Sequence, residues 1–201
     1  MPRYNLDQLL TKAPQKYTKD DFRRSREWFA EQAKKLGDRV SRTSVMNTPS
    51  RHRASFMPGK MYLFQYFPKG AKELPYYDML PLVIPFSADE ETFTGLNFHY
   101  LPYKVRYVLL KNLLDFATNP KLDEKTRLKM SWQFVGGISK YRGANSAVKK
   151  YRLDHMQSTF IEIPANQWFM ALLLPIENFN HGENAVYMDK NYVWQQSMKY
   201  L

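Results

Sequence analysis

The stretch that decides the fold is FMPGKMYLFQYFPKGAKELPYYDMLPLVIPFSADEETFTGLNFHYLP, residues 56–102. Short apolar runs at 61–67, 80–86 and 93–101 alternate with turn-forming residues at 58–59, 68–70 and 75. This alternation is typical of several short strands joined by tight connections. Prolines fix backbone angles and remove amide donors, so the strands beside them must be short or lie at sheet edges. The many tyrosines and phenylalanines favour a platform that contacts other molecules.

Helices are predicted on both sides of this stretch. Apolar spacing indicates helices over 18–37 and 103–117, and a further one over 123–134 that stops at Gly136 and Gly137. Shorter helices are predicted over 146–152 and 164–174, with a strand at 158–163 between them. Aromatic residues in 185–201 indicate a docking helix at the C-terminal end.

The resulting fold class is α+β. Strands near 61–67, 81–86, 94–100 and 158–163 would form a small antiparallel sheet, open or curled into a partial barrel, with flanking helices. Residues 38–54 are polar and basic, and we interpret them as an arm that reaches a neighbouring molecule. We therefore divide the chain into an N-terminal helix and basic arm (1–55), an α+β core (56–180) and a C-terminal docking helix or tail (181–201).

Positive charge is concentrated in two blocks. Residues 1–60 contain 14 Lys and Arg against 6 acids, and residues 125–152 contain 8 against none. Such blocks are expected of a protein that binds a polyanion, most often nucleic acid, although a solvated basic surface has the same composition. The predicted phosphate-binding residues are Arg39, Arg42, Arg51, Arg53, Lys140, Arg142, Lys149, Lys150 and Arg152.

Candidate catalytic groups are few. The four histidines form no metal-binding spacing, and the chain has no cysteine. A nuclease or hydrolase that uses His99 with Asp78 is conceivable, but a half-buried strand histidine bonded to backbone is favoured. The acidic run 89–91 is better explained as a solvated turn than as a metal site. No phosphate-binding glycine motif is present. We therefore expect no enzyme activity, no cofactor and no metal.

The apolar runs are too short to span a bilayer, and the N-terminal residues lack the apolar core of a signal peptide. The absence of cysteine agrees with a reducing compartment. We expect a protein that is made and kept inside a cell and has no membrane contact.

Three segments resemble a family of virion proteins from T-even-like bacteriophages with contractile tails. They contain LPYYD at 74–78, GLNFHYLP at 95–102 and a WFMALLLP segment at 168–175, and the similarity covers roughly 56–180. The resemblance implies a DNA end protector, or alternatively a neck or baseplate assembly protein without a DNA role. These motifs carry no catalytic residues.

The resemblance and the charge pattern together predict a non-enzymatic virion protein, made in the host cytoplasm. It would dock on other virion subunits and contact packaged DNA ends without sequence preference. The aromatic residues expected at the subunit interface are Tyr76, Tyr77, Tyr100, Trp168 and Trp194. A small nuclease is the least favoured alternative.

Overall fold

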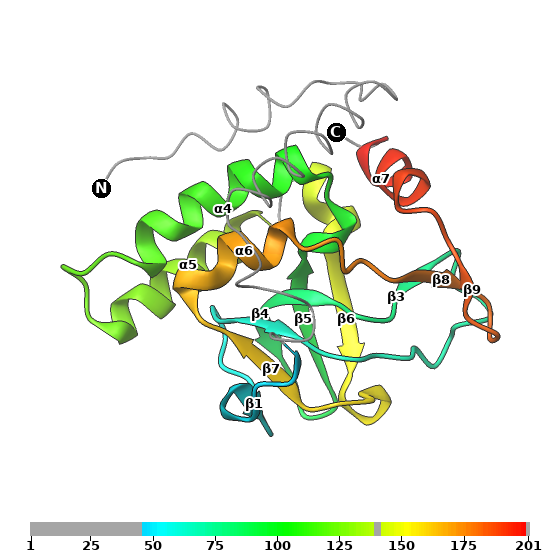
Figure 1. Cartoon of the computed structure of the whole chain (residues 1–201), viewed down its shortest axis with the longest axis horizontal. Coiled ribbons are helices and arrows are strands. Elements are labelled where there is room, and N and C mark those ends of the chain that lie inside the picture. Colours follow the sequence, from blue (N-terminus) through cyan, green and yellow to red (C-terminus); the bar gives the residue numbers. More distant parts are fainter. Residues whose placement is uncertain (1–45, 139–141, 200–201) are drawn as a thin grey trace.

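The computed structural model describes residues 46–138 and 142–199, and their fold is α+β, as predicted. Figure 1 shows helices stacked over one side of a twisted sheet, with a smaller sheet beside it. The predicted N-terminal helix (18–37), and with it the N-terminal extension, lies outside the described residues.

The main sheet has six strands in the order β1-β7-β2-β4-β5-β6, and all neighbouring pairs are antiparallel. The strands are β1 (His52–Arg53), β2 (Met61–Leu63), β4 (Leu82–Ala88), β5 (Thr92–Asn97), β6 (Val148–Arg152) and β7 (Phe160–Ile163). The four predicted strands correspond to β2, β4, β5 and β7, but β2 ends at Leu63 and residues 98–100 form a 3-10 helix in place of the end of the third strand. The sheet is open, since β1 and β6 are its two edges and do not pair with each other.

Alternation along the strands gives the sheet two different cores. Met61, Leu63 and Ile84 point to one face, where they join a large aliphatic cluster that includes the helices. Tyr62 and Phe64, between and after them in sequence, point to the opposite face. The side-chain period of two in a strand produces this division directly.

The opposite face is an aromatic core. Phe64 lies 5.7 Å from Phe93, 5.3 Å from Tyr151 and 5.5 Å from Phe160, measured between ring centroids. Edge-to-face contacts of this kind stabilise a core beyond the area they bury. The interpretation of the aromatic stretch as a contact platform is therefore wrong for these rings, because they pack against one another inside the chain.

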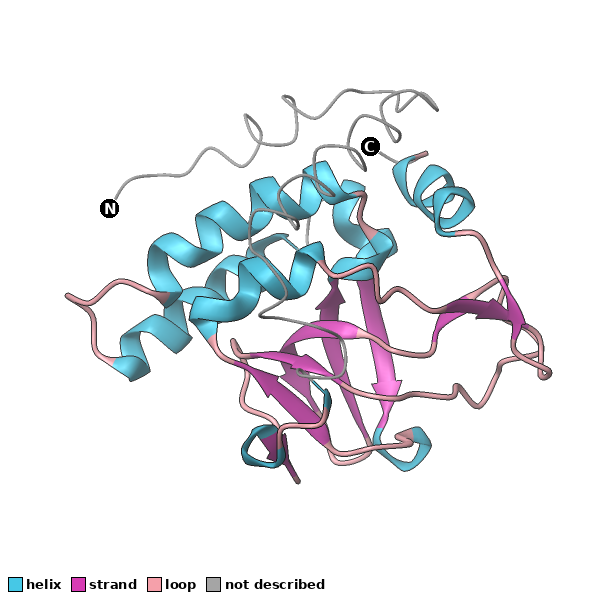
Figure 2. Cartoon of the chain, in the orientation of Figure 1, coloured by secondary structure: helices cyan, strands magenta, loops and turns pink. Residues whose placement is uncertain are grey.

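Helices cover the aliphatic face (Figure 2). Helix α4 (Tyr103–Ala117) has the predicted bounds, and α6 (Trp168–Leu173) lies within the predicted 164–174. Helix α5 (Glu124–Ile138) was expected to stop at its glycine pair but continues through it. Val135 and Ile138, on either side of the pair, are buried in the aliphatic core, and this burial outweighs the weak helix propensity of glycine.

Residues 148–152 form strand β6 and not the predicted short helix. All five residues pair with β5, and Tyr151 enters the aromatic core. Pairing with a distant strand thus overrides the local helical pattern. The prediction of an arm also fails for its last residues, because His52 and Arg53 pair with β7. Residues 38–45 of that arm lie outside the described part of the chain.

A three-stranded sheet, in the order β3-β8-β9, packs beside the main one. Its strands are β3 (Tyr77–Asp78), β8 (Phe179–His181) and β9 (Val186–Tyr187). It is followed by α7 (Lys190–Met198), where Asp189 caps the helix by accepting from the Asn191 amide. Val193 and Trp194 of α7 are buried, so this helix is docked on its own chain.

Candidate functional site

The described members of the predicted phosphate-binding set lie at both edges of the main sheet. Arg51 ends the 3-10 helix η2 (Pro49–Arg51) and Arg53 lies on β1, whereas Lys149, Lys150 and Arg152 lie on β6. Four strands separate β1 from β6. The structure therefore brings the β6 residues together but keeps them apart from those at β1.

Several of these cations are paired with acids of the same chain. Arg53 Nε lies 3.0 Å from Glu162 Oε2, and Arg152 Nη2 lies 2.7 Å from Asp154 Oδ2. Lys150 Nζ lies 3.3 Å from Asp89, with both side chains more than half exposed. An exposed pair such as Lys150–Asp89 contributes little free energy. The other predicted residues, Arg39, Arg42 and Lys140, lie outside the described residues, as does the side chain of Arg142.

Lys149 is placed differently from its neighbours. Its ammonium lies 4.0 Å from the centre of the Tyr100 ring, a cation–π geometry. Burial lowers the pKa of Lys149 to about 8. The ammonium is thus packed against the protein, and the expectation that Lys149 contacts a phosphate is not supported.

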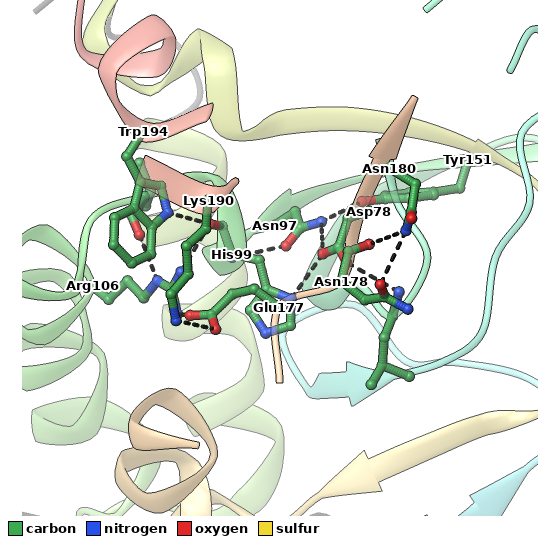
Figure 3. Close-up of polar contacts among 12 residues, drawn as sticks. Asp78, Asn97, His99, Arg106, Tyr151, Glu177, Asn178, Asn180, Lys190 and Trp194 are labelled. Atoms are coloured by element: carbon green, nitrogen blue, oxygen red, sulfur yellow. Dashed lines mark hydrogen bonds and ion pairs between the residues drawn. The ribbon is translucent and has the colours of Figure 1, made fainter. Parts of the chain in front are cut away.

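A buried polar network joins the main sheet to the small one (Figure 3). The carboxylate oxygen Oδ2 of Asp78 lies 2.8 Å from His99 Nδ1 and accepts a hydrogen bond from Asn97 Nδ2 at 3.1 Å. The same amide nitrogen donates to the Tyr151 hydroxyl at 3.0 Å. Asp78 Oδ1 accepts from the Leu80 backbone at 3.0 Å. Because an ionised carboxylate only accepts, His99 carries its proton on Nδ1 in this contact.

The backbone of His99 is also held. Its carbonyl accepts from Arg106 Nη2 and from Trp194 Nε1, both at 2.8 Å. Arg106 Nε donates to the Leu101 carbonyl at 2.5 Å, so the guanidinium holds two carbonyls of the segment that leads into α4. The 3-10 helix η3 (Phe98–Tyr100) and α7 are fixed to α4 through this one buried arginine.

Glu177 neutralises that arginine. Its Oε1 lies 2.6 Å from Arg106 Nη1, and its Oε2 lies 3.2 Å from Lys190 Nζ. Burial raises the pKa of Glu177, but electrostatic interactions with Arg106, His99 and Lys190 outweigh it and lower that pKa to about 2. The cationic groups of Arg106 and Lys190 also lie over the rings of Tyr103 and Trp194. This buried cluster ties α4, the segment before β8, and α7 together.

The pairing of His99 with Asp78 that a nuclease would use is therefore present, but it is enclosed. Both side chains are at most 1% exposed. His99 Nε2 has no hydrogen-bond partner among the described residues, and it has no path to solvent. A catalytic base must reach the proton that it removes, and here a substrate has no access. The geometry is that of a structural network.

Two cavities among the described residues are lined by neither His99 nor the Asp78 carboxylate. One, of about 240 Å³, lies between α5 and β7 and is lined in part by Lys60, Arg127 and Glu162. The other, of about 360 Å³, lies beside Gln65, Met79 and Asn178. Within 46–138 and 142–199, no three His, Asp or Glu side chains are grouped as a metal site would require.

The acidic run 89–91 is a turn. Asp89 accepts from the Thr92 backbone at 2.7 Å and from its hydroxyl at 2.6 Å, and also from the Glu91 backbone. The hydrogen bonds from Thr92 lower the pKa of Asp89 to about 2. This carboxylate is occupied in closing the connection from β4 to β5.

The aromatic residues predicted for a subunit interface are mostly internal. Tyr77, Tyr100, Trp168 and Trp194 are each less than 5% exposed, and the Trp168 indole donates to a backbone carbonyl at 2.8 Å. Only Tyr76 is half-buried, and it contacts the rings of its neighbours. The expectation that these four side chains contact another subunit is wrong for this structure, because they fill the core.

No helix in the described ranges has the length and apolar character needed to cross a bilayer. Comparison with curated proteins gives no match, and comparison with solved structures gives none either. A family model described as Phage T4 terminal DNA protecting protein matches residues 7–197. Since this match covers nearly the whole chain, including the buried network and both sheets, the chain belongs to the Phage T4 terminal DNA protecting protein family.

Proposed function

We propose that this protein is a non-enzymatic virion component that covers DNA ends through phosphate contacts and docks on other virion subunits. The family match over residues 7–197 carries the proposal, because the family is described by the protection of terminal DNA. Membership implies association with the phage particle, and we place synthesis in the host cytoplasm.

The charge distribution supports binding that is independent of sequence. Residues 125–152 contain eight Lys and Arg and no acid. Lys and Arg bind phosphates without reading bases, which suits a protein that must hold any genome end. Among the described residues, the exposed cations Lys150 and Arg152 on β6 are paired with exposed acids that a phosphate can replace.

The enclosed position of the His99–Asp78 pair supports a protecting role in place of a cleaving one. A nuclease requires a base, a nucleophile and stabilising groups that converge on an accessible position. The paired side chains are buried in the packing between the two sheets. Their hydrogen bonds instead set the position of η3 and β3.

A salt titration tests the DNA role. Binding to a linear duplex should weaken steeply between low and moderate salt, with a slope of several units in log K against log salt if ~5–8 phosphates are neutralised. The same protein should slow digestion of that duplex by an exonuclease. Absence of binding at low salt would leave the neck or baseplate assembly role as the surviving alternative.

A further inference from the structure

Trp132 on α5 is an exposed aromatic side chain held in one orientation. It is 43% exposed, yet its indole Nε1 donates to the Phe86 carbonyl on β4 at 2.5 Å. Here the polar edge of the indole is anchored to the sheet while part of the ring remains open to solvent.

The backbone beneath Trp132 is fixed as well. Gly59 has φ +87°, and a Cβ at this position would lie 2.6 Å from the Leu128 carbonyl and 3.3 Å from the Trp132 amide nitrogen. Only glycine permits this close approach of the 58–60 turn to α5. Helix α5 is therefore locked against the sheet at the turn that carries the indole.

Two lysines continue the surface of Trp132 along the helix. Lys125, Lys129 and Trp132 are all exposed and are separated by four and three residues, the spacing that places side chains on one face of a helix. Neither lysine has an ion pair within the described ranges. The rise of a helix separates the two lysines by about 6 Å along its axis.

We propose that this face of α5 (Lys125, Lys129 and Trp132) binds the terminal nucleotides of a DNA end, with the lysines on phosphates and the indole stacked on the last base. Stacking on an aromatic ring needs an open base face. The interior of a duplex has none, whereas an end presents one. This inference rests on the proposed function and adds to it a physical reason for preferring ends.

The neighbouring cavity is a poorer site for the same ligand. It contains Arg127 and Lys60, but Lys60 is already held by Glu162 at 3.1 Å and by Glu124 at 3.6 Å. Carboxylates in the wall would repel a phosphate. Neither Lys125 nor Lys129 has an ion pair within the described ranges, whereas Lys60 has two, so the charges of the α5 lysines are the more available to a phosphate.

The test compares an open linear duplex with a closed minicircle of the same sequence. The wild-type protein should bind the open duplex more tightly than the minicircle. Trp132→Leu should weaken binding to the open duplex by about 5- to 150-fold, the effect of losing one stacked base, and should leave binding to the minicircle unchanged. Trp132→Phe keeps an aromatic ring without the N–H donor. Unlike Trp132→Leu, it should therefore keep most of the wild-type preference for the open duplex.

Matched controls come from the other side of the molecule. Tyr187→Leu removes an aromatic side chain that is 67% exposed on β9, at the opposite end of the view from α5 (Figure 1). Lys125→Ala with Lys129→Ala should lower the salt slope by about two units. Lys69→Ala with Lys72→Ala removes the same charge from exposed positions in the loop before β3. This double variant should lower the salt slope by less than the α5 double variant does. Thermal melts of every variant verify folding.

The outcomes separate this inference from the function on which it rests. If wild-type protein binds no DNA, the proposed function itself fails. If it protects ends and Trp132→Leu protects them equally well, the α5 site is wrong while the function stands. If the α5 variants keep DNA binding but are no longer incorporated into particles, the face binds a virion subunit and the inference is overturned.

Discussion

Replacing Glu177 by Gln should destabilise the protein strongly and in a pH-dependent way. The side chains of Glu177 and Arg106 are at most 1% exposed and lie 2.6 Å apart. Glutamine keeps the shape and one acceptor but leaves the guanidinium buried without a counter-charge. Removing one partner of a buried pair costs about 3–5 kcal/mol. The pKa of Glu177, about 2 against a usual 4.5, corresponds to about 3 kcal/mol at 1.36 kcal/mol per unit.

The pH dependence identifies the cause of that loss. A lowered carboxyl pKa stabilises the folded state above the unfolded pKa of 4.5, and the stabilisation is lost as pH falls through the folded value of about 2. Wild-type protein should therefore lose about 1.4 kcal/mol per pH unit from this group below pH ~4.5. Glu177→Gln should lack this pH-dependent loss. The difference in free energy of unfolding between the two proteins should therefore become smaller as the pH falls.

Urea unfolding followed by circular dichroism measures this difference, first at pH 7 and then at acidic pH values down to the limit of folding. Glu91→Gln is the control, because Glu91 is 76% exposed and lies 3.9 Å from Arg152. Such a surface pair should contribute almost nothing. A loss below about 1 kcal/mol at pH 7, or a difference that does not change with pH, would refute the assignment of Glu177 as the counter-charge of the cluster.

Three further outcomes are expected. Lys149→Met should stabilise the protein at pH 7, because burial lowers the pKa of this lysine to about 8, and should leave DNA binding intact. In thermal melts, the gain in stability over the wild-type protein should vanish as the pH rises toward 10.5. Gly95→Ala should lower the free energy of unfolding by about 1–3 kcal/mol in urea, since its Cβ would lie 2.3 Å from Val83 Cγ1. His99→Ala should lower the melting temperature, and neither it nor the wild-type protein should cleave DNA with divalent metal, as judged on gels.

The strands of the core were predictable because their signal is local. Met61 and Tyr62 alternate between two faces, and prolines such as Pro58 mark where the chain turns. Helix α4 was equally clear from its apolar spacing after Pro102. Strand β6 was missed because residues 148–152 are extended only through their partner β5, and single-sequence patterns carry no information about partners.

The polar network illustrates a different limit. The possible pairing of His99 with Asp78 was visible from residue types, but its burial was not, because burial depends on β3 and β8 closing over the end of the main sheet. Nothing in the sequence around Arg106 indicates that its side chain is buried. Its partner Glu177 lies 71 residues away, and only the fold brings the two charges together. By contrast, the spacing of Lys125, Lys129 and Trp132 within a predicted helix was available in the sequence.

The paired cations at the sheet edges affect how a DNA-binding measurement should be interpreted. When a phosphate takes Arg152 from Asp154 or Lys150 from Asp89, the freed carboxylate acquires its own counterion. Part of the gain from releasing counterions of DNA is then cancelled. Such contacts contribute less to the salt slope than Lys125 and Lys129, which have no ion pair within 46–138 and 142–199. The slope therefore counts mainly cations that were free before binding, and it should be smaller than the net charge of +11 suggests.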